Sequence, residues 1–129
     1  MTKNLSVILC TYNEAKIINK TIDEIFLYNP NSEIIIVDSY GLGNYDKKQL
    51  QAMCQNRCAF HIISHSEKLN PGAARNIGVE KASGDYIAFI DIMTIPRVNW
   101  LSDYLKQINT GEAVDIIWGS TLYVVNNSG

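Results

Sequence analysis

The chain has 129 residues and a net charge of −2, and 47% of its residues are hydrophobic against 19% charged. This length fits one domain, and this composition excludes a disordered chain. Eleven Lys and Arg against thirteen Asp and Glu give none of the basic excess that a nucleic-acid-binding protein carries, and apolar runs such as residues 34–37 are far shorter than the ~20 residues that cross a bilayer.

The first half of the chain predicts strands that alternate with helices. Apolar residues predict strands over residues 5–10, 33–37 and 59–63. Between these strands, apolar residues recur at helical spacing over 17–28, and a weaker pattern predicts a helix over 47–58. The second strand is β-branched at almost every position, so we expect helices to cover both of its faces.

The second half continues the alternation. Asn70 and Pro71 predict a helix start, as N-cap and first helical residue, and the helix should run to about Lys81 with Ala74 and Gly78 toward the sheet. Further patterns predict a strand over 86–90, a helix over 100–108 and strands over 114–118 and 121–125. This order implies an α/β fold with three layers and a mostly parallel sheet, in which ligands bind beyond the carboxyl ends of the strands.

Four motifs lie at those strand ends or at the predicted helix start. They read Thr11-Tyr12-Asn13-Glu14, Val37-Asp38-Ser39, Gly72-Ala73-Ala74-Arg75-Asn76-Ile77-Gly78 and Asp91-Ile92-Met93. In this order they resemble the N-terminal, nucleotide-sugar-binding half of family 2 glycosyltransferases, which have the GT-A fold. The resemblance covers most of residues 5–101 and implies one GT-A-like domain over residues 1–129.

The resemblance implies a role for each motif in holding a nucleoside diphosphate sugar. Thr11, Tyr12 and Glu14 would line the pocket for base and ribose. Thr-x-x-Glu is also the pattern of a capping box, so we expect Thr11 and Glu14 to form the turn before the first helix while Tyr12 presents its ring. Asp38 would accept a hydrogen bond from the base, usually from uracil N3–H, and Arg75 would face the base and the phosphates.

The motif at Asp91 departs from the family's DXD pattern. In the family, the first Asp lies near the ribose and the last Asp binds Mg²⁺ or Mn²⁺ beneath the diphosphate. Met93 stands at that last position here, and a thioether is a poor ligand for a hard cation. We therefore expect Asp91 to contact the ribose, while Met93 argues against a metal site built on Asp91.

The implied activity is inverting transfer of a sugar from a nucleoside diphosphate donor, a UDP-sugar, to a hydroxyl of a saccharide, lipid or protein acceptor. The family's general base belongs to the acceptor-binding half. We expect that half beyond Gly129, so the 129-residue chain is predicted to be C-terminally truncated and inactive alone. The alternative is a non-catalytic nucleotide-binding module of the same fold.

Two other classes fit the sequence less well. A receiver-type signalling domain needs paired acids after its first strand, and a sugar-phosphate nucleotidyltransferase needs a Gly-rich loop there. Thr11-Tyr12-Asn13 supplies neither. Three cysteines cannot form a closed set of disulfides, which favours a reducing compartment, so we expect a cytoplasmic protein, the inner face of the membrane included.

Overall fold

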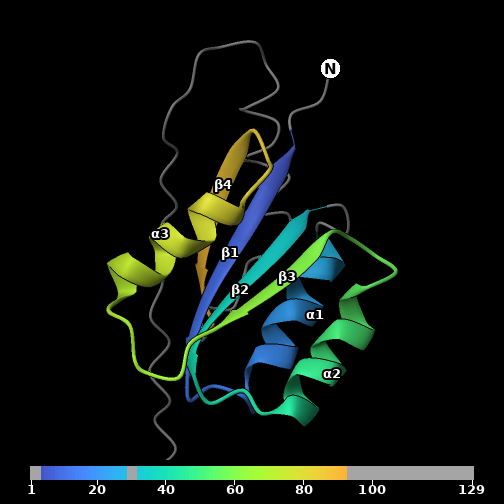
Figure 1. Cartoon of the computed structure of the whole chain (residues 1–129). Helices are drawn as coiled ribbons and strands as arrows, with labels where there is room; N and C mark the ends of the chain where they lie inside the picture. Colours follow the sequence, from blue (N-terminus) through green and yellow to red (C-terminus); the bar gives the residue numbers. More distant parts are fainter. Residues whose placement is uncertain (1–3, 29–31, 93–129) are drawn as a thin grey trace, which may run out of the picture.

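The computed structural model describes residues 4–28 and 32–92. Their elements follow the predicted alternation of strands and helices (Figure 1). They are β1 (Leu5–Tyr12), α1 (Ile18–Tyr28), β2 (Glu33–Tyr40), α2 (Asn44–Cys54), β3 (Phe60–Ser64), α3 (Pro71–Lys81) and β4 (Tyr86–Asp91). The helix and the two strands predicted after residue 92 lie outside the described residues.

The strands form a four-stranded sheet in the order β3-β2-β1-β4, and every neighbouring pair is parallel. In Figure 1, α1 and α2 cover one face of this sheet and α3 covers the other. The three-layer α/β fold predicted from the sequence is therefore confirmed. Because all four strands run the same way, their carboxyl ends meet at one edge, which we call the carboxyl edge.

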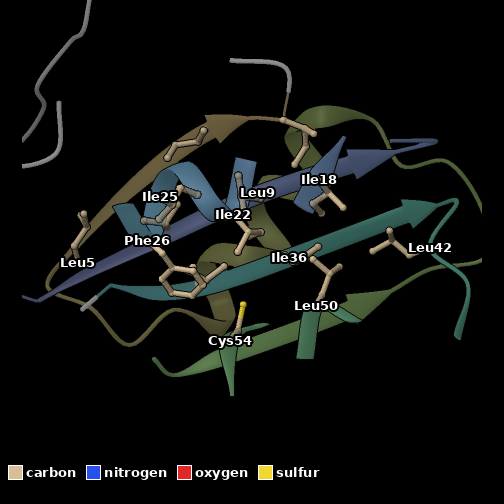
Figure 2. Close-up of a cluster of buried hydrophobic side chains, with 14 residues drawn as sticks. Leu5, Leu9, Ile18, Ile22, Ile25, Phe26, Ile36, Leu42, Leu50 and Cys54 are labelled. Atoms are coloured by element: carbon tan, nitrogen blue, oxygen red, sulfur yellow. The ribbon is translucent and has the colours of Figure 1, made fainter. Parts of the chain in front are cut away.

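The core lies on both faces of β2, as its β-branched sequence predicted. Ile34 and Ile36 belong to the cluster beneath α1 and α2, whereas Ile35 and Val37 pack beneath α3, and all four are fully buried. Figure 2 shows side chains of α1, such as Ile22, gathered with those of α2 over this face of the sheet. Both faces of β2 are therefore covered, which places this strand in the middle of the core.

Helix α3 starts where its sequence predicted and packs closely on the sheet. The side-chain oxygen of Asn70 accepts a hydrogen bond from the Ala73 N–H at 2.8 Å, which caps the helix. Ala74 and Gly78 are buried against the strands. A Cβ added at Gly78 would lie only 2.6 Å from Cγ2 of Ile8, so this close contact requires a glycine.

Some element ends differ from the prediction. Helix α2 begins at Asn44 instead of Lys47, because the Asp46 carboxylate accepts the Gly43 N–H at 2.8 Å and stabilises an earlier first turn. It ends at Cys54 instead of residue 58, where the Arg57 N–H turns back to the Cys54 carbonyl. Within residues 4–28 and 32–92, none of the helices is long and apolar enough to cross a membrane.

Candidate functional site

Residues from three of the motifs meet at the carboxyl edge. Each of three strands carries one of these residues at or near its carboxyl end: Tyr12 in β1, Asp38 in β2 and Asp91 in β4. Beside them is an open hollow of about 520 Å³ between the end of β2, the start of α2 and the end of β3. Its lining consists of Asp38, Tyr40, Gly41, Leu42, Gly43, Lys47, Ser64, His65 and Ser66. This is where ligands bind in parallel α/β sheets.

Asp38 is the buried acid of this hollow. Its side chain is 2% exposed, and its Oδ1 has no hydrogen-bond partner among the described residues. Burial raises the pKa of Asp38, and the Leu42 N–H, the Lys47 charge and the Ser64 hydroxyl offset that rise only in part. A buried acceptor without a partner is costly, so a ligand N–H placed here would gain a strong hydrogen bond.

The expected capping box at Thr11 and Glu14 does not form. Thr11 lies inside β1 and is buried, its Oγ1 has no hydrogen-bond partner among the described residues, and α1 begins only at Ile18. The reason is that β1 continues to Tyr12, paired with β2, and a residue inside a strand cannot cap a helix. Glu14 instead accepts the Tyr12 N–H at 3.2 Å, and its carbonyl accepts the N–H groups of Ile17 and Ile18.

Tyr12 is exposed at the end of β1. Its side chain is 40% exposed, and its ring centroid lies 6.2 Å from that of Tyr40 on the neighbouring strand. Thr11 is opposite Asp38 in the register and is buried, and neither Thr11 nor Tyr12 is among the residues that line the hollow. The structure therefore brings Tyr12 and Asp38 to one edge but leaves Thr11 beneath it.

Arg75 and Asp91 form a second group at this edge, on the face that α3 covers. A guanidinium nitrogen of Arg75 lies 3.6 Å from Oδ1 of Asp91, and the guanidinium carbon lies 5.9 Å from the centre of the Phe89 ring. The Asp91 side chain, at the end of β4, is 80% exposed and faces Arg75.

We tested these residues against the metal ion that the family pattern implies. Within residues 4–28 and 32–92, no three His, Cys, Asp or Glu side chains come together as a metal site would need. Asp91 offers one carboxylate, and that carboxylate faces a guanidinium. Met93 lies outside the described residues. The described residues therefore do not fit a Mg²⁺ or Mn²⁺ ion, and no chemical step is assigned to one.

Three residues of the hollow, Ser64, His65 and Lys47, were not predicted as site residues. Ser64 and His65 follow β3 directly, and Nε2 of His65 is buried without a hydrogen-bond partner among the described residues. The rule that pointed to the ends of the other strands would have found both. Lys47 was harder to find, because its place at the hollow depends on where α2 starts.

Residues 6–128 match the family described as Glycosyl transferase family 2, so the chain belongs to family 2 of the glycosyltransferases. The chain is 30% identical over 128 residues to Glycosyltransferase AglE of Haloferax volcanii. It is 32% identical over 111 residues to Polypeptide N-acetylgalactosaminyltransferase 4 of Mus musculus.

Solved structures share the fold. A mannosyltransferase of Pyrobaculum calidifontis, PcManGT, in complex with GDP-Man and Mn²⁺, superimposes with a TM-score of 0.75 over 86% of this chain at 21% identity. TarS of S. aureus, residues 1–349, in complex with UDP-GlcNAc, does so with a TM-score of 0.70 over 88% of this chain at 20% identity. The GT-A-like fold predicted from the motifs is therefore confirmed.

The chain matches only part of these proteins. It spans 41% of the Haloferax protein and 19% of the mouse protein. It covers 34% of the mannosyltransferase chain and 37% of the TarS chain.

Proposed function

We propose that this chain binds the nucleotide of a UDP-sugar at the carboxyl edge, as the donor site of a glycosyltransferase that transfers the sugar with inversion to an acceptor hydroxyl. Family membership supports the class of reaction. The observation that carries the donor site is Asp38, a buried carboxylate with an unpartnered oxygen in a hollow at the ends of β2 and β3.

Asp38 supplies the selectivity for the base in this proposal. An ionised carboxylate only accepts hydrogen bonds. Uracil N3 and guanine N1 each carry a hydrogen that a carboxylate can accept, whereas cytosine N3 and adenine N1 are acceptors themselves. Asp38 therefore favours the first pair and repels the second, and the resemblance to the family favours uracil between the two.

Arg75 and Asp91 extend the site across the sheet in this proposal. Strand β4 is two strands from β2, which is about 10 Å at ordinary strand spacing. A nucleotide bound with its base at Asp38 can run across β1 in that direction. Asp91 would then meet the ribose, and the Arg75 guanidinium would meet the phosphates once its contact with Asp91 loosens. Thr11 and Glu14 would hold Tyr12 and its loop in place from below.

The remaining parts of the proposal concern the whole protein. The acceptor is a hydroxyl of a saccharide, lipid or protein. The general base that deprotonates it is proposed to lie outside residues 1–129, so this chain alone binds a donor without transferring its sugar.

Base selectivity tests the donor site directly. Calorimetry with UDP, GDP, CDP and ADP should show UDP binding about 10- to 150-fold more tightly than CDP or ADP, the ratio expected for one charged hydrogen bond of about 1.5–3 kcal/mol. Asp38→Ala should abolish this preference. Asp23→Ala, which removes an exposed carboxylate of α1, is the matched control and should retain it. Equal affinities for all four nucleotides in the wild type would refute the proposal.

A further inference from the structure

Two tyrosines from adjacent strands stand exposed beside the hollow. Tyr40 at the end of β2 is 54% exposed and lines the hollow, and Tyr12 at the end of β1 is 40% exposed. Their ring centroids are 6.2 Å apart and their planes are inclined by 43°. Tyr40 is followed by Gly41-Leu42-Gly43, which lead from β2 into α2.

A local irregularity of the backbone brings these rings together. Thr11 pairs with Asp38, but the register then shifts, so that Tyr12 pairs with Tyr40 and not with Ser39. Ser39 is 3% exposed, and successive residues of a strand face opposite sides, so a regular register would place Tyr12 opposite a buried residue. Such irregularities often redirect a side chain next to a functional site.

The loop that follows β1 holds this shifted register in place. Asn13 adopts a left-handed conformation, with φ at 54°, and its N–H donates to the Tyr40 carbonyl at 2.8 Å. Gly41 has φ at 116°, and a Cβ there would lie 2.9 Å from both the N and the Cα of Asn13. A glycine is therefore required at position 41, and Asn13 holds the uncommon left-handed conformation beside it. Non-glycine residues in that conformation cost free energy and cluster at functional sites.

A lysine completes the group. Nζ of Lys68 lies 4.7 Å from the centre of the Tyr12 ring, within the range of a cation–π contact. Lys68 is exposed and comes from the segment between β3 and α3. It restrains the Tyr12 ring on one side and leaves a positive charge beside the aromatic pair.

From this arrangement we propose that Tyr40 is a base-stacking residue of the donor site, and that Tyr40 and Tyr12 form one aromatic platform against which the nucleobase packs. This inference rests on the proposed function. Tyr40 and Asp38 then make different contributions to nucleotide binding. Stacking tolerates every base, because every base has a π face, so Tyr40 contributes affinity, while Asp38 two residues earlier contributes selectivity.

This division of work gives a sharp test by calorimetry on the 129-residue chain. Tyr40→Leu should lower the affinities for UDP and GDP by a similar factor, between about 5- and 150-fold, and should leave the ratio of UDP to CDP affinity unchanged. Tyr40→Phe keeps the ring and should bind UDP within about twofold of the wild type. Inorganic pyrophosphate has no base, so its affinity should be the same for Tyr40→Leu and the wild type.

Tyr45→Leu is the matched control. Tyr45 is an exposed tyrosine of α2, 71% exposed, whose hydroxyl accepts from Nε2 of Gln49, and it does not line the hollow. This variant should bind UDP as the wild type does. Circular dichroism spectra should show that every variant compared is folded.

The outcomes separate the two proposals. If the wild type prefers UDP over CDP through Asp38 but Tyr40→Leu binds UDP within twofold of the wild type, the stacking role of Tyr40 is wrong and the donor site stands. It is equally wrong if Tyr40→Phe is as weak as Tyr40→Leu, because the hydroxyl and not the ring would then matter. If the wild type binds none of the nucleotides, the donor site itself is wrong and the stacking role falls with it.

Discussion

The contact between Gly78 of α3 and Ile8 of β1 allows a stability prediction worked from the structure. A Cβ on residue 78 would lie 2.6 Å from Cγ2 of Ile8, 3.2 Å from its Cδ1 and 3.4 Å from its Cγ1. Ile8 is 1% exposed in a strand paired on both sides, so it has little room to move. Gly78→Ala should therefore cost about 1–3 kcal/mol through overpacking, offset by about 1 kcal/mol of helix propensity.

We also expect the effect of Gly78→Ala on the free energy of unfolding to change from destabilising to stabilising once the Ile8 side chain is shortened. Ile8→Ala should itself cost about 2–5 kcal/mol, because it leaves a cavity under α3. In that background the clash is gone and the cavity has room for a methyl group, so Gly78→Ala should stabilise the protein by about 1 kcal/mol. The coupling between the two substitutions should then be about 1–3 kcal/mol.

Urea denaturation followed by circular dichroism measures the four members of this cycle. Gly72→Ala is the control on the same helix, since a Cβ there would find only Oδ1 of Asn70, at 3.5 Å, and we expect this variant to be at least as stable as the wild type. If Gly78→Ala changes the free energy of unfolding equally in both backgrounds, within about 0.5 kcal/mol, the close contact does not limit the packing of α3.

Two further predictions concern the ionisation of Asp38 and the effect of Mn²⁺ on UDP binding. The raised pKa of Asp38 means that its ionised form is less favourable in the folded than in the unfolded chain, so the free energy of unfolding falls as pH rises through that pKa. Thermal unfolding should therefore show Asp38→Asn to be more stable than the wild type at pH 7.5, with an advantage that shrinks toward about pH 4. An advantage independent of pH would contradict this prediction. In calorimetry, Mn²⁺ should change the affinity of the wild type for UDP little. Met93→Asp adds a hard oxygen ligand and should make the affinity for UDP increase with Mn²⁺. A strong Mn²⁺ effect on the wild type would show that another acid binds the ion.

Local signals in the sequence were enough for the order of elements. The β-branched run of β2 predicted a strand buried on both faces, and Asn70 with Pro71 predicted the start of α3 to the residue. Both signals act over a few residues, through side-chain burial and through a capping hydrogen bond. The four motifs predicted the family in the same way, and the match over residues 6–128 confirms it.

The roles of the predicted site residues remain predictions, and so do the sugar, the acceptor and the cellular location. For the site, the geometry changed what the motifs suggested. Thr-x-x-Glu was expected to cap a helix, but pairing between β1 and β2 extends the strand through Thr11 and leaves Glu14 to hold the Tyr12 N–H. The motifs also gave no sign that Asp91 faces Arg75 across from β4 to α3, because that contact joins two elements.

Neighbouring residues therefore encode the alternation of strands and helices, the buried faces, the start of α3 and the motifs. Other features depend on residues far apart in the chain. The Glu33 carboxylate, for example, joins the Ser6 hydroxyl at 2.7 Å to the backbone and side chain of Ser83 at 2.9 Å. The pairing of Tyr12 with Tyr40 likewise arises only when β1 and β2 meet, because register is a property of two strands and is encoded in neither alone.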